Sequence, residues 1–143
     1  MKVLIDADGC PVVDIAVALC INNNIDCYIL CDTAHEMQRT GAVTLTFDKG
    51  ADSVDFALVN RVESGDIVIT QDYGLASMCL AKKANVLHQD GWEYTQWNID
   101  ALLFQRHAAK EYRASGGRIK GPAKRKPAQD KAFLAALQQL VHG

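Results

Sequence analysis

The sequence lacks any apolar stretch near the roughly 20 residues that a membrane-spanning helix requires. Met1-Lys2 also leads directly into the apolar residues Val3 to Ile5, without the charged region, apolar region and cleavage site of a secretory signal. These two absences argue against a membrane-spanning helix and a signal peptide. We therefore expect a soluble, cytoplasmic protein with no membrane partner.

Cysteines are present, but they do not form a recognisable framework. The five cysteines are an odd number, and no two of them have CxxC spacing, which argues against a disulfide scaffold and a structural zinc site. We expect reduced thiols, with Cys20 and Cys79 as small core residues on helices. Cys10 lies at a predicted helix N-terminus, where a thiol pKa can fall, although packing explains it better.

Several common catalytic motifs are missing as well. The chain contains no GxSxG, no Walker loop and no GxGxxG motif. The sequence therefore gives no support for a hydrolase with a nucleophile elbow, an NTPase or a dinucleotide-binding protein. The four histidines have no spacing typical of a metal site; they are His35, His88, His107 and His142.

The patterns that are present indicate an α/β fold. With 143 residues and 49% hydrophobic residues, the chain is large enough for one domain with a substantial core. Strand-like apolar runs alternate with helical patterns over the first 90 residues, which predicts a parallel sheet with helices on both faces. The expected strands are residues 2–6, 26–31, 42–47, 66–70 and 85–88, and the expected helices are 11–22, 51–62, 75–83, 98–114 and 128–141.

The C-terminal part of the sequence changes in style. Residues 1–114 form the predicted α/β body, residues 115–127 a basic linker rich in Gly and Pro, and residues 128–143 an amphipathic helix. The linker has no core-forming pattern, and we expect it to be mobile without a partner. The helix can pack on the body or on a second subunit, which would give a homodimer.

Charge is distributed unevenly along the chain. Residues 1–105 contain six basic and fifteen acidic residues, whereas residues 106–126 contain eight basic residues and a single acid, Glu111. An acidic body with a basic arm suits a polyanionic partner such as a nucleic acid, with RNA favoured, although such a run can also be merely solvated. The expected phosphate contacts are Arg113, Arg118, Lys120, Lys124, Arg125 and Lys126.

Carboxylates follow two of the predicted strands. Asp6 and Asp8 come at the end of the first strand, and Asp72 comes shortly after the fourth. Because ligands of parallel α/β sheets bind beyond the carboxyl ends of the strands, we expect these acids at one rim. Clustered carboxylates repel one another unless a cation holds them, and Mg²⁺ or Mn²⁺ suits such oxygen ligands.

The helix predicted to begin near residue 51 supplies one more acid. Asp52 and Asp55 are both candidates, and Asp55 is preferred because Asp52 is the better N-cap. The predicted metal ligands are thus Asp6, Asp8, Asp72 and Asp55 or Asp52. The alternative is that Asp8 and Asp72 only cap helices. Asp48, Asp66 and Asp90 are weaker candidates, since loop acids and acids that begin strands are usually solvated.

Two long acidic motifs carry a family resemblance. Residues 5–12 (IDADGCPV) and residues 65–76 (GDIVITQDYGLA), together with Asn98-Ile99, Arg113, Gly121-Pro122, Asp130 and Phe133, resemble the YaiI/YqxD family of bacterial proteins. Gly9 stands where Ala or Ser is more familiar. The resemblance covers nearly the whole chain.

That family is in turn similar to PIN-domain proteins, whose acids bind Mg²⁺ or Mn²⁺ and cut RNA or DNA. The likeness implies a catalytic role for Asp6 and Asp72, with Asp55 or Asp52 as the helix acid. Two other functions stay open. An apolar strand followed by Asp-x-Asp also describes haloacid-dehalogenase-type phosphatases, and the basic arm suits a non-catalytic RNA-binding protein.

Overall fold

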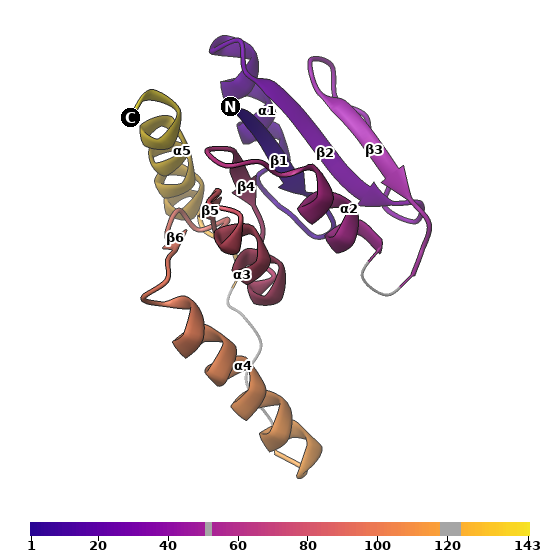
Figure 1. Cartoon of the computed structure of the whole chain (residues 1–143), viewed down its shortest axis with the longest axis vertical. Helices are drawn as coiled ribbons and strands as arrows, with labels where there is room; N and C mark the ends of the chain where they lie inside the picture. Colours follow the sequence, from indigo (N-terminus) through magenta and orange to yellow (C-terminus); the bar gives the residue numbers. More distant parts are fainter. Residues whose placement is uncertain (51–52, 118–123) are drawn as a thin grey trace.

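Six strands form one sheet in the computed structural model, which describes residues 1–50, 53–117 and 124–143 (Figure 1). The order is β3-β2-β1-β4-β5-β6, and β6 alone runs antiparallel to its neighbour. The predicted parallel α/β sheet is therefore confirmed, and only the two-residue β6 was not expected. The strands are β1 Lys2–Asp6, β2 Asp26–Asp32, β3 Val43–Phe47, β4 Ile67–Ile69, β5 Asn85–Leu87 and β6 Glu93–Tyr94.

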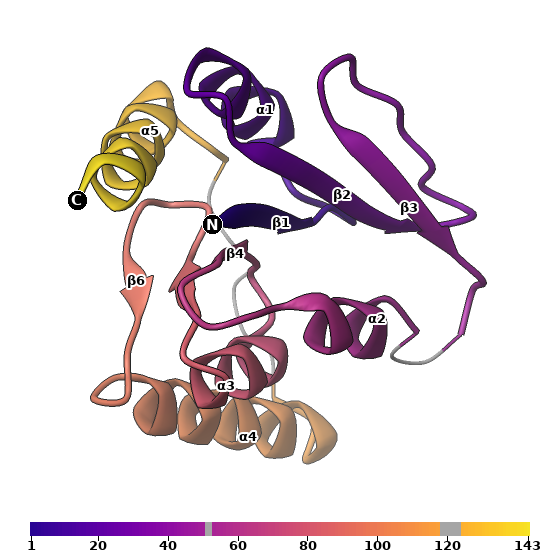
Figure 2. The ribbon, with the colours of Figure 1, turned by 45° about the horizontal axis from the view of Figure 1, so that its top comes forward.

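Helices cover both faces of this sheet, as predicted. Figure 2 shows α1 and α5 on one face and α2 and α3 on the other, with α4 packed outside α3. The first helix begins two residues later than expected, because Pro11 and Val12 lie in a turn. The helices are α1 Val13–Asn22, α2 Ser53–Arg61, α3 Tyr73–Ala81, α4 Ile99–Ala114 and α5 Pro127–His142.

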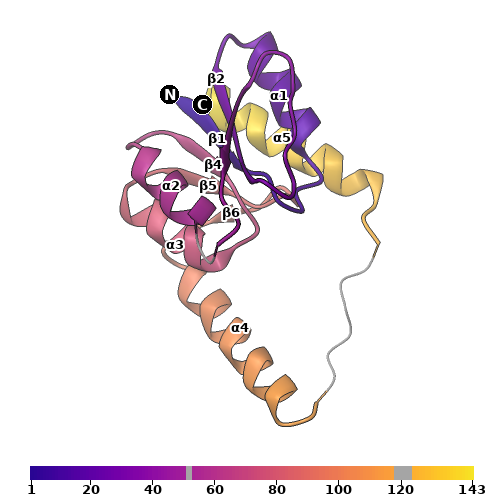
Figure 3. The same cartoon turned by 90° about the vertical axis from the view of Figure 1, so that its right-hand side faces the viewer.

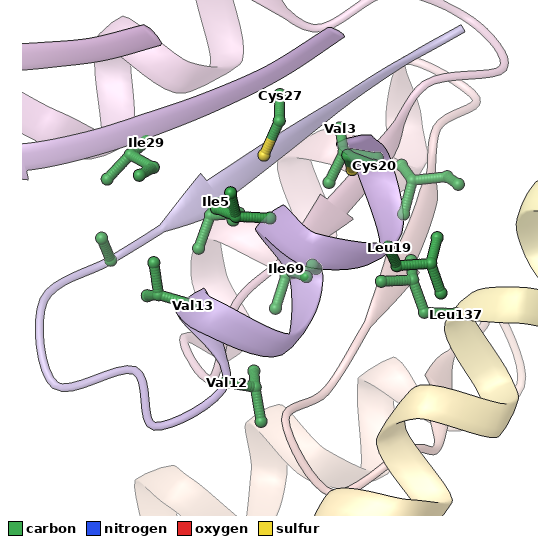
Figure 4. Packing of buried hydrophobic residues seen from close by; sticks show 14 of the residues in the cluster. Val3, Ile5, Val12, Val13, Leu19, Cys20, Cys27, Ile29, Ile69 and Leu137 are labelled. Carbon is green, nitrogen blue, oxygen red and sulfur yellow. The ribbon is translucent and has the colours of Figure 1, made fainter. Parts of the chain in front are cut away.

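The central strand β1 separates two apolar cores. Val3 and Ile5 point toward α1 and α5, whereas Leu4 points toward α2 and α3, and all three are at most 1% exposed. This is the alternation that a pleated strand imposes, here with both faces buried. Figure 4 shows the first core, where Leu137 of α5 lies near α1. The carboxyl end of β1, and with it Asp6, is thus held firmly.

The C-terminal helix α5 packs on the body of its own chain. Phe133 and Leu137 are fully buried in the core beside α1. Gly91 permits this close approach, because a Cβ at that position would lie 2.6 Å from the backbone of Ala132 and its φ of +93° disfavours other residues. Of the two predicted packing options, the structure has the one within the chain; a homodimer through this helix stays a prediction.

Arg125 fastens the start of α5. Its Nη1 donates to Asp90 Oδ1 at 2.8 Å, its Nε to Asp130 Oδ1 at 2.7 Å, and its Nη2 to the carbonyl oxygen of Gln89 at 2.8 Å. The Arg125 side chain is 21% exposed. Arg125, which belongs to the predicted basic linker, is therefore held by two carboxylates and a carbonyl oxygen.

Asp66 is not solvated, in contrast to the prediction. It is 4% exposed, and its carboxylate accepts hydrogen bonds from the backbone N–H of Lys2 and Glu63 and from Lys2 Nζ. Burial opposes its ionisation, but these hydrogen bonds and the Lys2 charge outweigh burial and lower the pKa of Asp66. Asp66 thus joins the amino ends of β1 and β4, at the edge opposite the predicted site.

Cys20 and Cys79 are fully buried, as expected for core residues. Burial raises the pKa of the Cys10 thiol to about 11, so its position before α1 does not activate it. Within the described residues, none of the helices has both the length and the apolar character needed to cross a bilayer.

Candidate functional site

An acidic cleft opens where the strand order reverses, between β1 and β4. Its volume is about 560 Å³. Four of the predicted acids line it, namely Asp6, Asp8, Asp55 and Asp72, and a fifth acid, Asp32, joins them from the end of β2. The other described lining residues are Gly50, Ser53, Val54, Gln71, Tyr73 and Arg106.

Asp6 ends β1 and is tied to the neighbouring strand end. Its Oδ2 accepts a hydrogen bond of 2.8 Å from the hydroxyl of Thr70, and the same hydroxyl accepts the backbone N–H of Asp72 at 3.0 Å. Burial, followed by the charges of Asp55, Asp72 and Asp8, raises the pKa of Asp6 to about 6 despite the Thr70 hydrogen bond. Thr70 therefore sets the spacing of two cleft acids.

Asp72 is both a helix cap and a cleft residue. Its Oδ1 accepts the backbone N–H groups of Gly74 and Leu75, which is the N-cap arrangement for α3. The same oxygen lies 3.4 Å from Nη1 of Arg106, which reaches the cleft from α4. The capping alternative is thus confirmed for Asp72, and it leaves Oδ2 as the oxygen for a ligand.

Asp8 lies in the turn after β1. Gly9 follows it with a φ of +70°, a conformation that suits glycine and lets the turn close beside Gln71. The Asp8 Oδ1 atom is buried and accepts no hydrogen bond within the described part of the chain. Burial and the nearby Asp32 charge raise the pKa of Asp8. No helix-capping bond is formed by Asp8, since α1 begins without a side-chain cap.

A compact set of donor atoms forms beside Asp8. Asp32 and His35 join it so that one donor atom from each of the three residues lies within 4.8 Å of the others. His35 Nδ1 is 2.8 Å from Asp32 Oδ1 and 3.8 Å from Asp8 Oδ1. Among the described residues this is the one such set of three, so Asp6, Asp55 and Asp72 line the cleft at wider spacing.

The helix acid comes from the first turn of α2. Asp55 lines the cleft, and of the neighbouring acids its charge has the largest effect on the pKa of Asp6. Asp52, the other candidate, lies outside the described residues.

Four of the six predicted nucleic-acid contacts lie in the described part of the chain, and none of these four lines the cleft. Arg113 is exposed on α4, and Lys124 and Lys126 are exposed before α5. Arg125 is occupied by Asp90 and Asp130, as described above. Arg118 and Lys120 lie outside the described residues.

Sequence reasoning missed two acidic or basic residues that line the cleft, Asp32 and Arg106, and two residues that contact the cleft acids, His35 and Thr70. The signal for Asp32 was present, because it follows the apolar run 27–31 as Asp6 follows 3–5. Thr70 precedes Gln71-Asp72, but a strand-end threonine alone indicates no function. The positions of His35 and Arg106 depend on how a loop and a distant helix pack beside the cleft, and no periodic pattern in the sequence predicts that packing.

Comparison with known proteins identifies a family. Residues 4–143 match the model of a family described as "Uncharacterized BCR, YaiI/YqxD family". The chain is 49% identical over 141 residues to a UPF0178 protein of Exiguobacterium sibiricum, which covers 99% of this chain and 96% of that protein.

Two further relatives are similar along their length. A UPF0178 protein of Natranaerobius thermophilus is 44% identical over 141 residues, covering 99% of this chain and 96% of its own. One from Ruminiclostridium cellulolyticum is 46% identical over 137 residues, covering 96% and 90%. The names of these relatives state no activity, and no solved structure matches the chain significantly.

Proposed function

The chain belongs to the YaiI/YqxD family, and we propose that it is a divalent-metal-dependent nuclease that hydrolyses phosphodiester bonds, RNA more readily than DNA. The proposal rests on one observation, the convergence of five carboxylates in a cleft at the switch point of a parallel sheet. The YaiI/YqxD family in turn resembles PIN-domain nucleases, and that resemblance favours the same choice.

The charge of the cleft supports a cation as its natural occupant. Five carboxylates are set against the guanidinium of Arg106, the one Lys or Arg side chain among the described lining residues. Such a group of acids is costly to keep ionised together, so folds rarely retain one without a function. A divalent cation would offset the repulsion and would also attract the phosphate of a substrate.

The donor atoms fit Mg²⁺ or Mn²⁺. Asp8 Oδ1 is buried without a hydrogen-bond donor among the described residues, which is the condition of an oxygen that a cation can satisfy. Asp6, Asp55 and Asp72 are spaced widely enough for an ion that keeps several of its waters, as Mg²⁺ does. The imidazole of His35, beside Asp8 and Asp32, would favour Mn²⁺ over Mg²⁺.

The residues in and beside the cleft would have separate roles in binding the metal and the substrate. Asp8, Asp32 and His35 would hold one ion, and Asp6, Asp55 and Asp72 would face the substrate phosphate through a second or shared ion. The metal, when bound, supplies a Lewis acid and lowers the pKa of a bound water. Thr70 holds Asp6 in place, and Arg106, which pairs with Asp72, would also contact a phosphate oxygen of the substrate.

The test is cleavage of labelled single-stranded RNA and DNA oligonucleotides in Mg²⁺, in Mn²⁺ and in EDTA. We expect cleavage only with metal, and its loss in Asp6→Asn and Asp72→Asn. Asp26→Asn is the matched control, because Asp26 is an exposed acid at the opposite end of β2. Absence of cleavage by the wild type with either metal, or equal loss in Asp26→Asn, would reject the nuclease proposal.

The two alternatives give different results in the same experiments. A phosphatase of the haloacid-dehalogenase type would form a phosphoaspartate on Asp6, detectable by mass spectrometry after quenching in acid. That reading has less support, because no lysine lines the cleft among the described residues. A non-catalytic RNA-binding protein would bind the oligonucleotides equally well in EDTA and release intact strands.

A further inference from the structure

A second hollow adjoins the acidic cleft. Its volume is about 320 Å³, and it shares Asp55, Asp72 and Arg106 with the cleft, so the two form one continuous depression. The shared residues mark the boundary between them. The walls of the second hollow come from α2, α3 and α4 and consist otherwise of Phe56, Gly74, Leu75 and Met78.

The walls of this hollow differ in chemistry from the cleft. Phe56 is 58% exposed and Met78 is 37% exposed, although both are large apolar side chains. The second hollow, next to the acidic cleft, thus presents the exposed ring of Phe56, the thioether of Met78 and the guanidinium of Arg106. An exposed ring in a depression beside the acidic cleft offers a stacking surface for a flat, partly apolar group.

The helix α4 extends from the same boundary. It begins beside α3, and its C-terminal half projects away from the body (Figure 3). The helix face that packs through Leu102 and Leu103 continues as Arg106, Lys110 and Arg113, because positions i, i+4 and i+7 share one face. These three cations span about 10 Å along the helix, and the first of them stands at the cleft.

We propose that the second hollow is a nucleotide subsite, in which an unstacked base lies on Phe56 while the adjoining phosphate meets Arg106. The backbone of the strand then follows Lys110 and Arg113 along α4. The inference rests on the proposed function for the identity of the polymer. It adds that the strand is single, because a base inside a duplex cannot reach the ring of Phe56.

Charge favours a nucleic acid over a second copy of the chain on this surface. A second copy that presented its own Arg106, Lys110 and Arg113 would repel these cations. A second copy that presented its acidic body would have to desolvate the three cations without offering them a continuous line of negative charge. A single strand supplies one phosphate per nucleotide and a base beside each, which matches cations along α4 and a ring in the hollow.

The experiment measures binding apart from cleavage, by fluorescence anisotropy of a labelled single-stranded RNA. Binding is measured in EDTA and, on an Asp6→Asn background, in Mg²⁺. We expect Phe56→Ala to weaken binding about tenfold and Phe56→Trp to retain it. Phe104→Ala is the matched control, since Phe104 is an exposed ring on α4 that lines neither hollow.

An oligonucleotide with abasic sites separates stacking from charge. It should bind the wild type and Phe56→Ala equally, because an abasic strand has no base to stack on Phe56 in either complex. Equal loss in Phe56→Ala and Phe104→Ala, or a loss that persists with the abasic strand, would overturn the subsite. So would a wild type that binds no RNA under either condition.

The contacts of Arg106, Lys110 and Arg113 with phosphates are tested by measuring how the affinity for RNA depends on salt concentration. Three phosphate contacts predict a slope of log K against log salt of about −2, and Lys110→Gln with Arg113→Gln should reduce it to about −0.7. The control is Lys83→Gln with Lys131→Gln, which removes the same charge from exposed positions outside α4. An unchanged slope in the α4 variant would show that Lys110 and Arg113 do not contact phosphates. RNA binding without RNA cleavage would support the nucleotide subsite and reject the nuclease proposal.

Discussion

Asp6→Asn should stabilise the metal-free protein at neutral pH. Burial and neighbouring acids raise the pKa of Asp6 from 3.8 to about 6. Each tenfold change in proton affinity corresponds to about 1.4 kcal/mol, so ionised Asp6 costs the folded state up to about 3 kcal/mol. Asparagine removes the charge and keeps an oxygen that can accept the Thr70 hydroxyl.

The sign of the pH dependence follows from the raised pKa. Between pH 4 and 6 the folded state binds more protons at Asp6 than the unfolded state does, so wild-type stability falls as pH rises through this range. Above pH 6 the full cost is present, and below pH 4 it is absent. Asp6→Asn lacks this dependence, and the two proteins should differ most at pH 7 to 8.

The assay is thermal unfolding in EDTA from pH 4 to pH 8. At pH 7.5 we expect a melting temperature about 5 to 10 °C higher in Asp6→Asn, with the difference vanishing near pH 4. Asp26→Asn serves as the control for loss of a negative charge at an exposed site. A variant that is less stable than the wild type throughout, with no pH-dependent difference, would refute the argument from burial and repulsion.

Three further outcomes follow from the site and from α5. Millimolar Mn²⁺ should raise the wild-type melting temperature by a few degrees through binding to the native state, and the rise should shrink in Asp72→Asn but not in Asp26→Asn; no rise in the wild type would contradict a metal site. Arg125→Gln should lower the melting temperature by about 5 to 10 °C and increase protease cleavage near α5, because two carboxylates lose their cation; unchanged stability would show that Arg125 does not fasten the helix. Arg106→Gln should bind Mn²⁺ up to about fivefold more tightly by isothermal titration while raising the KM for RNA; weaker metal binding would exclude competition between Arg106 and the metal.

The central strands β1 and β4 were predictable because they are buried on both faces. Continuous apolar runs such as 3–5 and 67–69 indicate central parallel strands, and the acids after them are placed at one rim by topology alone. The sequence could not indicate β6, since two residues show no alternation. It also could not show that Asp66 is buried, because its partner Lys2 is 64 residues away.

The parts of the site that were missed depend on tertiary packing. Asp32 was left outside the second predicted strand because the apolar run before it ends at Cys31, yet β2 continues through Asp32. Arg106 is an exposed residue of α4, and only packing of α4 on α3 brings it to Asp72. Arg125 was grouped with the basic arm by composition, which cannot distinguish a solvated cation from one held by Asp90.

Three of the cleft acids, Asp6, Asp32 and Asp72, each accept hydrogen bonds through one carboxylate oxygen. Asp6 uses Oδ2 to accept the Thr70 hydroxyl, Asp32 uses Oδ1 for its turn and His35, and Asp72 uses Oδ1 to cap α3. In the described part of the chain, none of their hydrogen bonds uses the second oxygen. Capping and metal binding are therefore compatible in one residue. It also follows that Asp→Asn variants, which keep an accepting oxygen, test charge separately from structure, whereas Asp→Ala variants would remove both at once.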